Sequence, residues 1–210
     1  MFAAEALPDR FYLTGTDTEL GKTHVSALLC AAFGYDYWKP VQAGLDEETD
    51  SERVARLAGC RVHPERFALK RPASPHAAAY DEGIRLRLDD FALPEAERLL
   101  VEGAGGYQVP YAAEPTLWQG DLIRHLALPA VVVARSGLGT LNHSITTLRA
   151  MRQDGLTVAG MILVGDEHLE NARDIAAMGE VPVLGRIPWF SNPEVSVDAA
   201  VQTLGRGDQR

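Results

Sequence analysis

Cysteine is scarce in this chain: Cys30 and Cys60 are its two cysteines among 210 residues. They form neither a CxxC pair nor a cluster with metal-ligand spacing, which argues against a disulfide framework and a cysteine zinc site. Cys30 lies in an apolar helical run. We therefore expect buried free thiols, as in proteins of a reducing cytoplasm.

Positive charge and long apolar runs are also lacking. Twenty basic residues stand against 29 acidic ones, for a net charge of −9, which argues against a nucleic-acid or membrane-surface partner. No apolar run is long enough to span a bilayer, and the opening MFAAEALPDR lacks the pattern of a signal peptide. The 46% hydrophobic content predicts one compact domain over 1–210, with a short flexible N-terminus and a polar C-terminal tail.

Apolar runs of strand length alternate with helical patterns along the chain. Strands are expected at 10–14, 36–41 (stopping at Pro40), 99–106, 130–137, 158–166 and 181–189. Helices are expected at 22–33, 50–59, 117–127, 140–154 and 168–178, while 60–94 reads as irregular with a possible helix at 74–83. This alternation predicts an α/β fold with a mostly parallel central sheet and helices on both faces. Ligands of such folds bind at the carboxyl ends of the strands, where the glycine-rich breaks of this chain fall.

The stretch TGTDTELGKT (14–23) has the features of a phosphate-binding loop. It follows a strand, precedes a helix and ends in Gly21-Lys22-Thr23. In such loops, backbone N–H groups hold phosphate, the lysine reaches the outer phosphates and the threonine hydroxyl ligates Mg²⁺. The sequence therefore predicts a P-loop NTPase-like fold that binds a nucleotide.

Two acids and a lysine lie at further strand or helix ends. Glu102 ends an apolar strand and is placed to hold Mg²⁺, the alternative being a solvated loop glutamate. Asp50 starts a helix after Thr49, so a capping role competes with a metal role. Lys39 ends the strand after the phosphate loop, where a functional role competes with that of a solvated surface lysine.

Six motifs occur together in one order: GTDTELGKT, KPVQAG (39–44), ASPHAAA (73–79), VEGAGG (101–106), GLGTLNHS (137–144) and LGRIPW (184–189). The set resembles the dethiobiotin synthetase family over about residues 10–195. The resemblance implies ATP- and Mg²⁺-dependent ring closure of 7,8-diaminononanoate with CO₂, through a carbamate and a carbamic–phosphoric anhydride. It also implies a cytoplasmic homodimer with a substrate site near the interface.

The resemblance assigns roles residue by residue. The implied catalytic residues are Lys39, Lys22 and Thr18, and the implied magnesium ligands are Thr23, Asp50 and Glu102. The nucleotide is expected to contact Gly15, Thr16, Asp17, Glu19, Leu20, Gly21, Lys22, Thr23, His24, Asp50, Glu102, Gly103, Ala104, Gly105, Gly165, Pro188, Trp189 and Phe190. The substrate is expected to contact Thr18, Lys39, Ala43, Gly139, Thr140 and Asn142.

Two positions depart from the common family pattern. Ala43 stands where many members carry a hydroxyl residue, so a substrate hydrogen bond is either missing or supplied by Gln42 or water. Gly165 stands where some members have an asparagine that reads adenine, which leaves the preference for ATP over other triphosphates open.

Two other classes compete with the ligase. Nucleotide-switched ATPases of the MinD/ParA type share the sheet but carry a lysine early in the loop, where this chain has Asp17. The ATP-binding half of a cobyrinate amidase would normally accompany a glutaminase domain, for which this chain shows no reactive-cysteine context. The acidic Glu19 lies at the loop mouth, where we expect it to attract a substrate with two amino groups.

Overall fold

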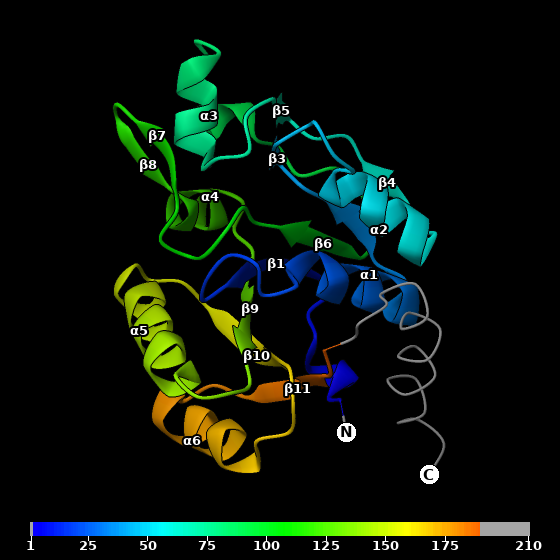
Figure 1. The fold of residues 1–210 in the computed structure, drawn as a ribbon, viewed down its shortest axis with the longest axis vertical. Coiled ribbons are helices and arrows are strands. Elements are labelled where there is room, and N and C mark those ends of the chain that lie inside the picture. Colours follow the sequence, from blue (N-terminus) through cyan, green and yellow to red (C-terminus); the bar gives the residue numbers. More distant parts are fainter. Residues whose placement is uncertain (1, 190–210) are drawn as a thin grey trace.

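The computed structural model describes residues 2–189, and it is built on a seven-stranded sheet (Figure 1). In spatial order the strands are β11 (Val183–Ile187), β10 (Val158–Val164), β9 (Ala130–Arg135), β1 (Arg10–Gly15), β6 (Leu99–Glu102), β2 (Asp36–Trp38) and β4 (Val62–His63). All neighbouring pairs are parallel. The predicted parallel α/β fold is therefore confirmed.

Side chains alternate between the two faces of the sheet, and each face has its own hydrophobic core. Phe11 and Leu13 of β1 pack with the apolar face of α1 (Lys22–Phe33) and with Val54 of α2 (Asp50–Ala58). Tyr12 between them points the other way. Because strand side chains alternate with a period of two, fully apolar strands require cover on both sides.

Four helices contribute to the core on the second face. These are α3 (Pro75–Asp81), α4 (Gln119–His125), α5 (Thr140–Gln153) and α6 (Leu169–Gly179). Of these, α3 packs against β3 (Val41–Ala43), β5 (Phe67–Leu69) and β7 (Pro110–Ala113). In Figure 1, α5 and α6 lie together below the level of β1, while α3 and the hairpin of β7 and β8 (Thr116–Trp118) project above it. Short 3₁₀ turns at Ala4–Ala6 and Leu88–Asp90 complete the described helices.

Two local predictions were wrong in part. The expected strand 36–41 breaks at Lys39 and Pro40, and Val41–Ala43 (β3) pairs instead with β5 (Phe67–Leu69) in a separate small sheet. Proline lacks the N–H that a continuing strand needs. The expected helix 117–127 starts only at Gln119, because Thr116–Trp118 (β8) forms an antiparallel hairpin with β7 (Pro110–Ala113).

The remaining predictions were confirmed or refined. The possible helix at 74–83 exists as α3, with Pro75 in its first turn, but 60–94 also contains β4 and β5 and is less irregular than expected. Cys30 is buried and free as expected, whereas Cys60 is only half-buried. No helix within residues 2–189 is both long and apolar enough to cross a membrane.

Candidate active site

The phosphate loop lies between the carboxyl end of β1 and the start of α1. Five residues, 16–20, separate Gly15 from Gly21, one more than in the common motif, so Thr16 takes the motif's first position. Gly21 has a φ of 80° and Glu19 a φ of 53°, left-handed conformations that turn the loop into the helix. Leu20 is buried in the core beside α1, so it anchors the loop.

The side chain of Asp17 is used within the loop. Its carboxylate accepts a hydrogen bond of 2.7 Å from the backbone N–H of Thr18, and its backbone oxygen accepts one of 3.1 Å from Lys22 Nζ. Burial lowers the pKa of Lys22, while the nearby carboxylates of Glu102 and Asp50 partly oppose this effect. The Asp17 carboxylate therefore stabilises the loop backbone, and the Asp17 carbonyl orients the Lys22 side chain toward the loop.

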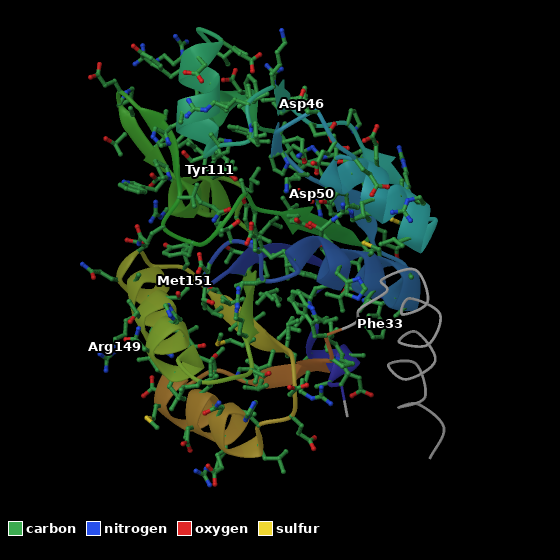
Figure 2. All side chains as sticks on the ribbon, viewed as in Figure 1. Phe33, Asp46, Asp50, Tyr111, Arg149 and Met151 are labelled. Carbon is green, nitrogen blue, oxygen red and sulfur yellow. The ribbon has the colours of Figure 1, made fainter. Side chains whose placement is uncertain are left out.

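Three strand or helix ends bring the predicted metal ligands together. β6 lies beside β1, so its last residue, Glu102, ends next to the phosphate loop. Thr23 Oγ1 lies 3.0 Å from Glu102 Oε1 and 2.6 Å from Asp50 Oδ1. Figure 2 places Asp50 at the inner end of α2, above β6. Thr49 caps this helix in a reciprocal pair with Glu52, so the capping prediction is confirmed for Thr49, and the Asp50 carboxylate is left to face Thr23.

Lys39 joins this cluster from the adjacent strand. It is 6% exposed and Glu102 is 1% exposed. Lys39 Nζ pairs with Asp50 Oδ2 and lies 3.4 Å from Glu102 Oε1. Burial alone would lower the pKa of Lys39, but Glu102 and Asp50 raise it above its ordinary value. The alternatives of a solvated surface lysine and a solvated loop glutamate are therefore wrong.

Glu102 has two further donors that the sequence reading missed. Ser26 Oγ donates to Glu102 Oε2 at 2.6 Å and the Tyr37 hydroxyl donates at 3.1 Å. Ser26 lies three residues after Thr23 on the same helix face, and Tyr37 lies on β2 two residues before Lys39, so the spacing could have revealed both. These donors fix the carboxylate that Lys39 and Thr23 share.

The donor set fits a magnesium ion. Two carboxylates and a threonine hydroxyl converge beside a phosphate loop, and Mg²⁺ prefers oxygen ligands completed by water and phosphate. Within residues 2–189, no group of three or more His, Cys, Asp or Glu side chains is arranged to hold a metal.

Two cavities meet at this cluster. The smaller, of 420 Å³, is lined by the phosphate loop from Thr18 to His24 except Leu20, and by Asp50, Arg53, Glu102, Val164, Pro188 and Trp189. The larger, of 820 Å³, extends from the loop past Ala43 and Pro72–Pro75 to α5. Thr18, Glu19, Lys39, Asp50 and Gly105 line both. A group bound in one cavity would therefore touch a group bound in the other at these residues.

Most predicted nucleotide contacts lie on the smaller cavity, with some exceptions. Phe190 lies outside the described residues. Gly15 and Leu20 are buried and line neither cavity. Gly165 does not line the smaller cavity, although its neighbour Val164 does. Thr16, Asp17 and Ala104 line the larger cavity instead.

Gly103 serves packing more than close phosphate approach. A Cβ atom at this position would lie 1.9 Å from Gln119 Oε1 and 2.7 Å from the Tyr12 ring. Gln119 is fully buried, and its amide nitrogen donates to the Gly106 oxygen at 2.8 Å. The buried Gln119 side chain, which the sequence analysis did not single out, therefore stabilises the glycine-rich loop after β6.

The predicted substrate residues divide in the same way. Ala43 and Asn142 line the larger cavity. Gly139 caps α5 with a φ of 90°, and the buried Thr140 hydroxyl faces Ser144 Oγ at 3.3 Å, so neither lines the cavity. The Gln42 amide nitrogen donates to the backbone oxygens of Ala43 and Gly44, and its buried Oε1 has no hydrogen-bond partner among the described residues.

His143, also on α5, lines the larger cavity and is exposed.

Together, a parallel sheet, a phosphate loop and a carboxylate–lysine cluster define a P-loop nucleotide-binding enzyme. A family model described as an AAA domain matches residues 9–195. The solved ParA family ATPase of Chlorobium tepidum is 12% identical, covers 96% of each chain and superposes with a TM-score of 0.54. At that identity the likeness shows the fold alone.

Curated relatives narrow this class. The ATP-dependent dethiobiotin synthetase of Novosphingobium aromaticivorans is 48% identical over 94% of this chain and 95% of its own. That of Rhodopseudomonas palustris is 46% identical over 85% and 87%, respectively. The chain belongs to the ATP-dependent dethiobiotin synthetase family. It is thus an ATP-dependent ligase of biotin biosynthesis, as its motifs predicted.

Proposed function

We propose that the protein closes a cyclic urea on 7,8-diaminononanoate, using CO₂ and ATP and releasing dethiobiotin, ADP and phosphate. The observation that carries this proposal is the pair of cavities that share Thr18, Glu19, Lys39, Asp50 and Gly105. The reaction needs the terminal phosphate of ATP to lie next to the amines of the substrate. The residues that line both cavities, here called the shared wall, are where these two groups would come into contact.

The chemistry has three steps. One amine adds to CO₂ and loses a proton, giving a carbamate. A carbamate oxygen then attacks the terminal phosphorus of ATP, forming a carbamic–phosphoric anhydride and releasing ADP. The second amine attacks the carbonyl carbon and expels phosphate as the ring closes. Each step places negative charge beside the shared wall, so positioning and charge neutralisation are the main demands on the protein.

Each of these groups has candidate binding residues along the two cavities. Lys22 and the loop N–H groups would hold the outer phosphates, and Lys39 would bind the carbamate and the transferring phosphoryl group from the shared wall. Thr18 lies at the substrate side of the loop. Thr23, Asp50 and Glu102 would hold Mg²⁺, which supplies charge neutralisation on the phosphates when it is bound. The α5 wall with Asn142 would receive the carbon chain of the substrate.

We also propose a homodimer, with the loop before α5 at the interface. Leu138 is fully exposed in the single chain, and Gly139 and Thr140 follow it without lining the cavity of their own chain. Sedimentation equilibrium of the wild type and Leu138→Arg measures this: the variant is expected to shift toward monomer. A wild type that sediments as a monomer would contradict the proposed assembly.

Mass spectrometry tests the reaction. ATP, bicarbonate and 7,8-diaminononanoate are incubated with the protein, and ¹³C-bicarbonate should add one heavy carbon to the cyclic product. Phosphate release should need both the diamine and bicarbonate. Equal nucleotide hydrolysis with and without the diamine would contradict the proposal.

A further inference from the structure

The smaller cavity is lined by a cationic side chain that has no role in the proposed reaction. Arg53 lines this cavity together with Lys22, Lys39 and Asp50. It lies three residues after Asp50 on α2, and residues at this spacing share one face of a helix. The arginine is therefore directed toward the same space as the acid that faces the phosphate loop.

The charges of the cavity leave room for another cation. Lys22 and Lys39 are balanced by Asp50 and Glu102. Glu19 adds a negative charge at the mouth of the cavity. ATP carries about four negative charges and Mg²⁺ two positive ones, so the bound complex would add a net negative charge to a site without surplus positive charge. Arg53 is the remaining cation among the described lining residues.

Arg53 is held loosely by an exposed partner. Its Nε donates to Glu48 Oε2 at 3.1 Å, and nearly half of its side chain is exposed. Glu48 is held independently by Arg56, at 2.7 Å from Nε and 3.0 Å from a terminal nitrogen. If Arg53 moves away, the Glu48 carboxylate still has Arg56 as a hydrogen-bond partner.

We propose that Arg53 is a phosphate-binding residue, which exchanges Glu48 for the polyphosphate chain when nucleotide enters. The planar guanidinium presents two terminal nitrogens that suit paired phosphate oxygens. This inference rests on the ATP site of the proposed function and adds to it a residue that neither the loop nor the metal cluster contains.

Displacement of a fluorescent ATP analogue in the presence of Mg²⁺ tests the inference. Arg53→Ala is expected to weaken ATP binding at least about tenfold, since a charge-assisted contact is lost. The affinity for inorganic tripolyphosphate should fall by the same factor, because the proposed contact is to phosphate. Unchanged tripolyphosphate binding beside weakened ATP binding would place Arg53 on the nucleoside and overturn the inference.

Two matched variants separate phosphate contact from helix stability. Arg56→Ala removes the other partner of Glu48 on the same helix, and Arg56 lines neither cavity, so ATP affinity should stay within about twofold. Glu48→Gln frees Arg53 and should tighten ATP binding severalfold. If Arg53→Ala and Arg56→Ala weaken ATP binding equally, Arg53 serves only the surface ion pair. Far-ultraviolet circular dichroism checks folding, and Arg53→Lys supplies a second variant with an intermediate expected loss.

Failure of this inference is distinguishable from failure of the proposed function. A wild type that does not bind ATP would contradict the function itself. A wild type that binds ATP as tightly as Arg53→Ala would contradict the role of Arg53 alone.

Discussion

Lys39 carries the sharpest prediction at the level of single residues, because it is the shared partner of two carboxylates. Lys39→Met keeps most of the aliphatic stem and removes the charge. Glu102 is buried, so its carboxylate and that of Asp50 are then left facing each other. We expect a loss of about 3 kcal/mol in the free energy of unfolding and a loss of product formation by orders of magnitude, measured by urea denaturation and by mass spectrometry.

Magnesium provides the control for this variant. With the lysine gone, Asp50 and Glu102 are free to bind a cation, so Mg²⁺ should raise the melting temperature of Lys39→Met more than that of the wild type. Lys39→Arg keeps the charge and should respond to Mg²⁺ like the wild type. Identical responses in all three proteins would remove Asp50 and Glu102 from the metal site.

Glu19 supplies a second prediction at the residue level. It is exposed at the loop mouth and lines both cavities, so geometry alone does not assign it to either ligand. Because the diamine is cationic, Glu19→Gln should raise KM for the diamine more than KM for ATP. Steady-state kinetics with each substrate varied in turn measures this. A larger effect on ATP would assign Glu19 to the nucleotide.

At the level of elements, the loop after β6 depends on the buried Gln119 at the start of α4. Gly103→Ala would place a methyl group 1.9 Å from Gln119 Oε1, and overpacking of this kind costs about 1–3 kcal/mol. In a Gln119→Ala background the closer of the two contacts is removed and only the one with the Tyr12 ring at 2.7 Å remains, so the same substitution should cost less. Urea denaturation of the two single variants and the double variant measures this coupling.

Gly137→Ala is the matched control for this cycle. A Cβ atom at position 137 would meet only His168, at 4.0 Å, so the free energy of unfolding should change little. Additive effects of Gly103→Ala and Gln119→Ala would show that the loop is not held by this contact.

The sequence predicted the parallel sheet well because its strands are buried on both faces and are therefore continuously apolar. It failed where local pattern and tertiary pairing disagree. Thr116–Trp118 precedes an apolar helix and reads as part of it, but its strand conformation depends on pairing with β7, which the local pattern does not encode. Pro40 marked a break, yet nothing local indicated that Val41–Ala43 would join β5.

The same contrast applies to the site. The phosphate loop, Lys39 and Glu102 were visible because each falls at a strand end. Asp50 was ambiguous because capping and metal binding favour the same position, and the structure shows that Thr49 provides the cap. Arg53 and Gln119 were missed because one looks like an ordinary surface arginine and the other like a polar residue between elements. Their roles depend on what the fold places opposite them.

For the whole molecule, the shared wall predicts that the two ligands bind cooperatively. Thr18, Glu19, Lys39, Asp50 and Gly105 line both cavities, so phosphates on one side lie close to amines on the other. A nonhydrolysable ATP analogue with Mg²⁺ should bring negative charge toward the cationic diamine and raise its affinity about fivefold or more.

Linkage makes this prediction strict. The diamine must raise the affinity for the ATP analogue by the same factor, and isothermal titration in both orders measures the two values independently. ADP with Mg²⁺ is the control. It lacks the terminal phosphate that would reach the shared wall, so it should raise the affinity for the diamine by a smaller factor. Independent binding in both orders would mean that the cavities, although joined in the fold, do not bring their ligands into contact.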